Sequence, residues 1–305
     1  MIQQIDFIHK EDEAARRELA AIPGFDKLAS WFLRFGVEKY LHGVMMAQHI
    51  RLSRTQLPEI YRLLPEVCEG FGIEEPEFYL EMAPAPNAYT MGDERKFLVV
   101  TSGLLQHVVN EDERKAVLAH ECGHIVCRHV FYSTIARMMV VLGDALGFVG
   151  DFIGPINVAL NYWCRRSELS ADRAAALFCA SPEPMVRSLM RFSGGPESII
   201  GKVNIEEFSK QAEAYKELQT NSKWHKLLQS CAVMNADHPF TSVRINELRK
   251  WSSTNEFQAM VRVFNAPHCA TCGERIETGQ NFCRRCGSRI PKTRKGTKRC
   301  SLKKE

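Results

Sequence analysis

A segment in the middle of the chain constrains the fold more than any other feature. Asn110 is a residue type that caps helix N-termini, and Glu113 follows it at the spacing of a capping box. The acidic run Glu111–Glu113 suits the positive end of a helix dipole. We therefore predict a long helix that begins after Asn110 and continues past Tyr132.

This predicted helix contains the sequence His120-Glu121-Cys122-Gly123-His124. Residues four apart lie on one helix face, so both imidazoles can reach one metal ion. Zinc lowers the pKa of a bound water towards ~7, and the adjacent Glu121 is placed to take the proton of that water. The alternative is a solvated helix face that carries two histidines by chance.

A zinc site of this type needs a third ligand. His129 does not fit the longer pattern HExxHxxGxxH, which needs glycine at Cys127 and histidine at Val130. We expect His129 to be a structural residue of the same helix. Glu168, on a second predicted helix, is the better candidate for the third ligand. Asp172, one turn later, is placed to accept the free N–H of a ligating histidine, although a Glu/Asp pair at this spacing is often only a solvated face.

Most of the remaining chain has helical patterning, with a small amount of strand. Runs of β-type residues at Glu77–Leu80 and Phe97–Val100 flank the turn-rich stretch Pro84–Gly92. We predict an α+β fold, mostly α, with a small antiparallel sheet beside the long helix. The other predicted helices are Glu11–Ala21, Leu28–Ile50, Ile60–Phe71 with a kink at Pro65, Gly103–Val109, Arg165–Cys179, Pro184–Ser193, Ile205–Leu228 and Ser242–Trp251.

The apolar stretch Met138–Leu160 is about long enough to cross a bilayer. It contains Asp144 and Asp151, each of which costs roughly 2.5–3.5 kcal/mol near a bilayer centre. We predict a buried or amphipathic helical hairpin and no transmembrane span, and leave contact with a membrane surface as an alternative.

Four cysteines near the C-terminus form a second motif. Cys269 and Cys272 are separated from Cys283 and Cys286 by ten residues, which gives CxxC-x10-CxxC. Four thiolates at this spacing are typical of a structural zinc site, and the metal would stabilise a segment too short to form a core. We predict a zinc ribbon; the alternative is a pair of redox dithiols.

The charge of the chain is uneven. Residues 262–305 contain 12 of the 40 Lys and Arg residues and 3 of the 36 Asp and Glu residues, so they carry +9 and the rest of the chain carries −5. The basic tail beyond the cysteines is a candidate for docking a partner, but few aromatic residues accompany it and the nucleic-acid signal is weak. The N-terminal residues carry no apolar run of signal-peptide length. With 11 cysteines, an odd number, we expect a reducing compartment.

Several motifs follow one another along the chain: Pro86–Gly92, Thr101–Leu105, the histidines His120, His124 and His129, Glu168–Arg173 and His238–Arg244. Together they resemble the HtpX and CAAX-prenyl-protease type of zinc metallopeptidases, within the gluzincins. The resemblance covers roughly Ala20 to Trp251, and it suggests a soluble branch because the transmembrane helices of the membrane-embedded relatives are missing.

The resemblance implies a role for each matching residue. His120, His124 and Glu168 would bind the catalytic zinc, and Glu121 would be the base and then the proton donor. Asn87 and Ala88 would lie beside the cleft, where an extended peptide can pair with an edge strand. His238 and Arg244 would approach the metal from the far side and stabilise an oxyanion.

The sequence therefore predicts a zinc metalloendopeptidase that holds one catalytic and one structural zinc ion, with a function in protein quality control. The other reading is an inactive scaffold that binds partners through its zinc ribbon and tail. We expect a cytoplasmic location, with contact at a membrane surface left open. The predicted divisions are a helical segment, 1–50, the peptidase domain, 51–264, the zinc ribbon, 265–290, and a disordered tail, 291–305.

Overall fold

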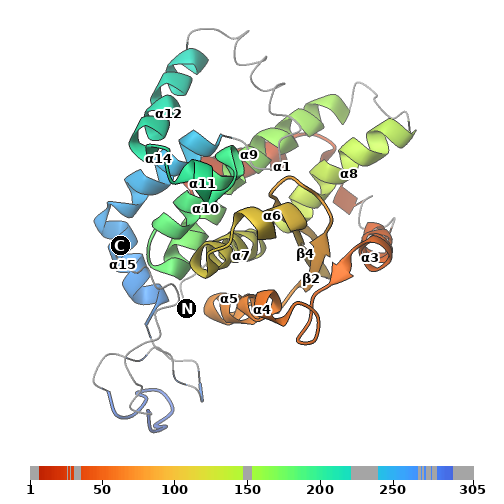
Figure 1. Ribbon diagram of the computed structural model, residues 1–305. Helices are drawn as coiled ribbons and strands as arrows, with labels where there is room; N and C mark the ends of the chain where they lie inside the picture. Colours follow the sequence, from red (N-terminus) through yellow and green to blue (C-terminus); the bar gives the residue numbers. More distant parts are fainter. Residues whose placement is uncertain are drawn as a thin grey trace.

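The computed structural model describes residues 7–25, 27, 29–30, 36–146, 153–220, 240–266, 269, 271–272, 276 and 280–290. Most of this chain is helical, and it contains one small sheet (Figure 1). The helices are α1 (Lys10–Ala20), α3 (Val37–Gln48), α4 (Pro58–Tyr61), α5 (Leu63–Phe71), α6 (Ser102–His107), α7 (Glu111–Val126), α8 (Val130–Leu146), α9 (Ile153–Cys179), α10 (Glu183–Gly194), α11 (Glu197–Ile200), α12 (Ile205–Thr220), α14 (Thr241–Ser252) and α15 (Asn255–Phe264). The strands are β1 (Ile50–Arg51), β2 (Glu77–Glu81), β3 (Ala88–Gly92) and β4 (Lys96–Thr101).

The sheet is mixed, so the prediction of an antiparallel sheet was wrong. Its strand order is β1-β2-β4-β3; β2 and β4 are parallel, whereas β1 and β3 are antiparallel to their neighbours. After β2, the chain first forms β3 at the edge of the sheet and then β4, which lies between β2 and β3. The run Phe97–Val100 supplies residues to both faces of the sheet, because successive strand residues point to opposite faces and both faces are covered.

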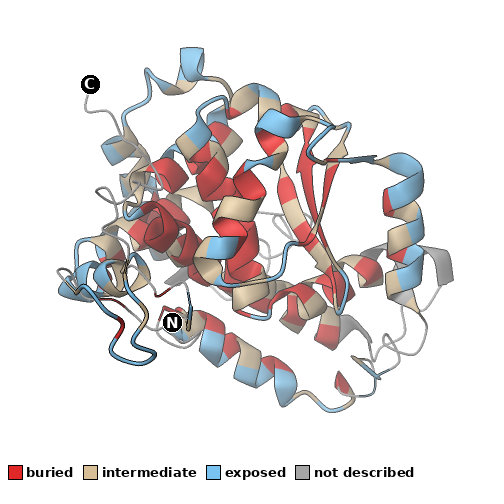
Figure 2. Ribbon diagram, turned by 90° about the horizontal axis from the view of Figure 1, so that it is seen from below, coloured by how far each residue is buried: buried red, intermediate tan, exposed pale blue. Residues whose placement is uncertain are grey.

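Two apolar clusters meet at this sheet. Leu98 and Val100 belong to the cluster that contains residues of α5, α7, α9 and α10. Phe97 and Val99 belong to the second cluster, with residues of α1, α3 and α8 and Trp163 of α9. Figure 2 shows the buried residues concentrated in the central helices and strands. The helix α7 therefore runs through the middle of the protein, where 11 of its 16 residues are buried.

The N-cap residue of α7, Asn110, was predicted correctly, but the capping-box role predicted for Glu113 was wrong. The side chain of Asn110 accepts a hydrogen bond from the backbone N–H of Asp112 at 2.8 Å. The buried side chain of Glu113 does not complete a capping box; it pairs with the guanidinium of Arg191 on α10. Glu113 therefore ties the beginning of α7 to α10.

The end of α7 lies earlier than predicted. The helix ends at Val126, and a new helix, α8, begins at Val130. Arg128 adopts a left-handed conformation, with φ of 59°, which interrupts the α-helical path. His129 consequently lies in the break between two helices and not within one long helix.

Other predicted elements differ mainly at their ends. The segment Ile60–Phe71 is two helices, α4 and α5, and Pro65 lies in the first turn of α5, where its missing N–H needs no partner. Ile50 belongs to a strand, and α3 begins at Val37. The predicted helix Ile205–Leu228 is seen to Thr220, and its remainder lies outside the described residues.

The predicted helical hairpin corresponds to α8 and the first part of α9, which pack against each other on either side of the undescribed residues 147–152. The side chains of Met138, Ile156 and Leu160 are buried. Within the part of the chain that is described, none of the helices combines the length and the apolar character needed to cross a membrane.

Candidate metal centre

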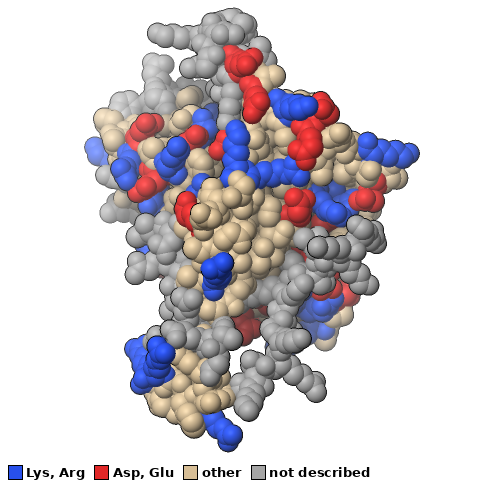
Figure 3. Space-filling view, turned by 90° about the vertical axis from the view of Figure 1, so that its left-hand side faces the viewer, with Lys and Arg blue, Asp and Glu red and all other residues tan. Residues whose placement is uncertain are grey.

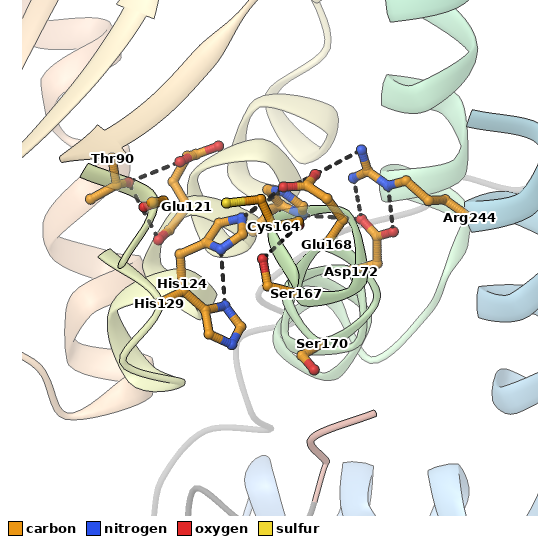
Figure 4. Close-up of polar contacts among 12 residues, drawn as sticks. Thr90, Glu121, His124, His129, Cys164, Ser167, Glu168, Ser170, Asp172 and Arg244 are labelled. Carbon is orange, nitrogen blue, oxygen red and sulfur yellow. Dashed lines mark hydrogen bonds and ion pairs between the residues drawn. The ribbon is translucent and has the colours of Figure 1, made fainter. Parts of the chain in front are cut away.

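The two histidines of α7 and Glu168 of α9 meet in the interior of the protein. Nε2 of His120 lies 3.3 Å from Nε2 of His124. The carboxylate of Glu168 faces both rings, with Oε2 at 3.4 Å from His120 Nε2 and Oε1 at 3.4 Å from His124 Nε2. All three residues are buried. Figure 4 shows the imidazole of His124 and the carboxylate of Glu168 turned towards each other.

The spacing of these donor atoms fits a zinc ion. Ligands about 2.0–2.2 Å from a tetrahedral zinc lie about 3.3–3.6 Å apart. The two histidine Nε2 atoms are 3.3 Å apart, and each lies 3.4 Å from a different oxygen of Glu168, so these distances fall in this range. Two imidazoles and one carboxylate leave a fourth position for water or substrate, as in catalytic zinc sites. The residues present therefore suit zinc in both chemistry and spacing.

The carboxylate of Asp172 and the guanidinium of Arg244 contact His120 and Glu168. Nδ1 of His120 lies 3.0 Å from Oδ1 of Asp172, as expected for a second carboxylate one turn after Glu168. Arg244 on α14 donates from Nε and Nη2 to the two oxygens of Asp172, at 2.8 and 2.6 Å. Its Nη1 lies 2.9 Å from Oε2 of Glu168. The guanidinium of Arg244 thus holds both carboxylates and is itself buried.

These charges shift the pKa values of His120 and Asp172. Burial lowers the pKa of His120, but Asp172 and Glu168 favour its protonated form more strongly and raise the pKa to about 9. Burial raises the pKa of Asp172, yet the charge of Arg244 and its hydrogen bonds hold that pKa below the usual value. For His124, burial lowers the pKa. The carboxylate of Asp172 is therefore kept charged in a buried site, which suits the binding of a cation nearby.

Glu121 lies next to the group and is held by a residue that the sequence interpretation missed. Oγ1 of Thr90, on β3, donates a hydrogen bond of 2.8 Å to Oε2 of Glu121 (Figure 4). Both residues are buried. Ala88 and Thr90 are two residues apart, so their side chains lie on the same face of β3, and both are buried. This period of two could have indicated that Thr90 faces the interior, next to Glu121.

The other predicted site residues have different outcomes. Ala88 begins β3, which is an edge strand of the sheet, and the carbonyl of Asn87 accepts a hydrogen bond from the N–H of Thr101. Strand β3, which begins directly after Asn87, contacts α7 and reaches Glu121 through Thr90. His238 lies outside the described residues. Cys122 is turned away from the metal ligands, and its Sγ lies 4.0 Å from Sγ of Cys68 on α5.

The four C-terminal cysteines come together at a separate place. Their four Sγ atoms all lie within 4.8 Å of one another. Gly287, which follows Cys286, has a φ of 71°, as expected for a tight turn after the second cysteine of a pair. Ile276 and Ile290 pack against the cysteines. The described charged residues of this segment are the exposed arginines Arg284, Arg285 and Arg289. Figure 3 shows Lys and Arg side chains at the lower end of the molecule.

A comparison with protein families identifies the peptidase centre. The model of peptidase family M48 matches residues 55–252, which include β2–β4, α7, α9 and all the residues of the metal centre described above. The chain belongs to peptidase family M48. It is therefore a metalloprotease, a hydrolase of peptide bonds, and the resemblance to HtpX-like metallopeptidases is confirmed.

Individual M48 relatives extend this result. The chain is 30% identical to the plastoglobule-localized metallopeptidase 48, chloroplastic, of Arabidopsis thaliana, over 85% of this chain and 76% of the relative. It is 28% identical to a protease HtpX homolog of Paraburkholderia phytofirmans, over 54% of this chain and 65% of the relative. A protease HtpX homolog of Ralstonia pickettii is 24% identical over 77% of this chain and 86% of the relative. No solved structure matches the chain significantly.

M48 peptidases are zinc-dependent, and the group His120, His124 and Glu168 is able to bind a metal ion. The matched family region does not include α1, α15 or the four C-terminal cysteines. The family therefore identifies the type of catalytic centre, whereas the roles of the flanking segments must come from their own contacts.

Proposed function

We propose that this M48 peptidase is a zinc-dependent endopeptidase whose metal is held by His120, His124 and Glu168, with Glu121 as the general base. The observation that carries the proposal is the approach of the three side chains: the Nε2 atoms of His120 and His124 lie 3.3 Å apart, and each is 3.4 Å from an oxygen of Glu168. Glu121 directly follows His120 in α7. A zinc ion held there would supply a Lewis acid that makes water acidic and polarises a peptide carbonyl.

Glu121 moves the proton in this proposal. Its carboxylate takes a proton from the attacking water and passes it to the amine that leaves when the peptide bond breaks. Thr90 holds the carboxylate on the side of β3, which supports a fixed orientation for the base. Oδ1 of Asp172 faces Nδ1 of His120 at 3.0 Å, and the other ring nitrogen, Nε2, faces His124 and Glu168.

The substrate in this proposal is an extended peptide that lies along β3. The support is the position of β3 at the edge of the sheet and its contact with α7. An extended peptide beside Asn87 and Ala88 would add a strand and bring its carbonyl groups past Glu121.

Arg244 and His238 have separate roles in the proposal. We assign Arg244 the positioning of Glu168 and Asp172, because both of these carboxylates already surround its guanidinium. This replaces the oxyanion role predicted from the sequence, which needs a donor directed at the substrate. His238 remains the candidate for that role.

The C-terminal part has a structural function in the proposal. Cys269, Cys272, Cys283 and Cys286 hold a second zinc ion, supported by their mutual approach and by the turn at Gly287. The proposed divisions remain 1–50, 51–264, 265–290 and 291–305. The zinc ribbon and the basic tail are the proposed docking site for a partner or substrate.

The place of action is also part of the proposal. We keep the prediction of a cytoplasmic enzyme of protein quality control, with contact at a membrane surface as the second possibility. The name of the relative from Arabidopsis thaliana refers to plastoglobules, and this favours testing association with plastoglobules as well.

The substitution Glu121→Gln tests the mechanism. We expect cleavage of an unfolded protein such as casein to fall at least 10²–10⁴-fold, roughly the size of a general-base contribution, while the zinc content stays unchanged. The matched control is Glu69→Gln, an exposed carboxylate on α5, which should cleave normally.

The same assay separates the proposal from an inactive scaffold. Chelator-sensitive cleavage by the unaltered chain is expected, with recovery after zinc is added back. A Glu121→Gln variant that cleaves at the normal rate would contradict the role of Glu121. A fully zinc-loaded, folded chain without any peptidase activity would favour the scaffold.

A further inference from the structure

A chain of hydrogen bonds leads from the metal centre to the N-terminal helix. Nδ1 of His124 lies 3.0 Å from Nδ1 of His129, and Nε2 of His129 lies 2.9 Å from Oδ2 of Asp12 on α1. All three side chains are buried. Asp12 lies outside the region matched by the M48 family, residues 55–252. The proposed ligand His124 is thus connected to a carboxylate that the family match does not contain.

The proposed metal site fixes the direction of these hydrogen bonds. Nε2 of His124 faces His120 and Glu168, so a metal held there leaves the ring proton on Nδ1. That proton is donated to Nδ1 of His129, which must then be an acceptor. The proton of His129 is on Nε2 in consequence, and it is donated to Asp12. With these tautomers, each ring nitrogen of His124 and His129 that donates a proton faces an acceptor, and each that lacks one faces a donor or the proposed metal.

Asp12, the last residue in this series of hydrogen bonds, is itself held by two donors. Its Oδ2 accepts a hydrogen bond of 2.6 Å from Ser170, and its Oδ1 accepts one of 3.1 Å from the indole N–H of Trp163. Both donors lie on α9, the helix that carries Glu168. The backbone N–H of His9 also donates to Ser170 at 3.0 Å, which fixes the start of α1 against the same helix.

The break between α7 and α8 is what brings His129 into this position. The left-handed residue Arg128 turns the chain, and the N–H of His129 donates to the carbonyl of His124 at 2.8 Å. The ring of His129 then lies next to that of His124, with the ring centroids 5.2 Å apart. The ring of His129 also packs against Trp163, with centroids 5.4 Å apart. The ring therefore has little freedom to rotate.

We propose that Asp12 and His129 are positioning residues of the metal centre, which hold the tautomer and orientation of His124. The inference rests on the proposed zinc site. It gives the two histidine ligands the same kind of support: Nδ1 of His120 faces a carboxylate oxygen of Asp172 directly, and Nδ1 of His124 is linked to Asp12 through His129. It also makes α1 a part of the metal centre.

The test measures zinc affinity in the full-length chain by competition with a chromophoric chelator. The catalytic binding step is identified as the step that His124→Ala removes, which separates it from zinc bound by the cysteines. We expect Asp12→Asn to weaken this step about 10–100-fold, the usual effect of losing such a support. The control Glu13→Gln, on an exposed side of α1, should bind zinc normally.

Two substitutions of His129 distinguish hydrogen bonding from packing. The amide oxygen of His129→Asn can accept from His124, whereas His129→Leu fills space without an acceptor. We expect zinc binding to be weaker in the Leu variant than in the Asn variant, and the visible spectrum of the cobalt-loaded site to change in the same order. Near-ultraviolet circular dichroism and thermal unfolding of the metal-free variants check that they fold.

Four outcomes are decisive. A folded Asp12→Asn variant with wild-type zinc affinity would overturn the inference, as would a Leu variant that binds zinc as tightly as the Asn variant. If His124→Ala removes no binding step from the unaltered chain, the proposed metal site itself fails. If it removes one, and Asp12→Asn and both His129 variants leave that step unchanged, only the positioning role fails.

Discussion

Gly123 of α7 and Ala174 of α9 face each other so closely that a Cβ atom on Gly123 would lie 2.7 Å from the Cβ of Ala174. Heavy side-chain atoms do not approach this closely without displacement. Ala171, one turn before Ala174, is also within reach, at 3.3 Å from that position. The absence of a side chain at Gly123 thus lets the helix with the two histidines lie against the helix with Glu168.

The substitution Gly123→Ala is therefore expected to destabilise the protein, although alanine favours helix formation. Overpacking of a core typically costs about 1–3 kcal/mol in the free energy of unfolding, and here it would also separate His120 from Glu168. The matched control is Gly43→Ala on α3, where nothing lies near the added Cβ and a gain of up to about 1 kcal/mol is expected. Urea unfolding measures both, and equal effects would contradict the argument.

Removal of the guanidinium at Arg244 should affect both stability and activity. In Arg244→Met, the buried carboxylates of Asp172 and Glu168 lose their cation, which typically costs about 3–5 kcal/mol. Arg244→Lys keeps the charge but cannot hold both carboxylates in the same way, so we expect folded protein with roughly 10–100-fold lower activity. The control is Arg249→Lys on the same helix, where the ion pairs are partly exposed. Normal activity of a folded Arg244→Lys variant would rule out the positioning role.

Thr90→Val tests the support of the general base. Valine has nearly the same shape but cannot donate to Glu121, and a hydrogen bond to a charged group is worth about 1.5–3 kcal/mol. We expect kcat to fall roughly 10–100-fold, with unchanged zinc content and little change in KM. Tyr89→Phe, which removes a hydroxyl of the same strand that bonds to Glu81, serves as the control. A selective rise in KM would indicate a role in substrate binding instead.

Metal analysis tests the C-terminal cysteines. The chain is expected to contain two zinc ions, and Cys283→Ser should remove one of them and leave the peptidase activity in place. Since metal binding provides the folding energy of such a small segment, residues 265–290 should also become sensitive to limited proteolysis. A single zinc in the unaltered chain, or loss of peptidase activity with Cys283→Ser, would contradict this division of roles.

Local sequence patterns predicted much of the structure. The cap at Asn110 and the spacing of His120 and His124 depend on the geometry of one helix, which is the same in any fold. The β-type run Phe97–Val100 likewise formed a strand, because its residues suit a buried sheet. The predicted member of the metal centre from a second helix, Glu168, did meet the two histidines. It was chosen as one of two carboxylates a helical turn apart, and the family resemblance implied the same role.

The tertiary structure decided the partners of the buried polar groups. Glu113 has the spacing of a capping residue, but Arg191 from a distant helix binds it, since a buried charge needs an opposite charge more than a helix end needs a second cap. In the same way, Asp12, Thr90 and Arg244 received their roles from packing that joins segments far apart in the chain. The sequence by itself determined the helices, the strands and the chemical type of the centre, because these follow from local geometry. Only the packed structure decided which side chains hold that centre in place, because burial forces each polar group to find its partner across the fold.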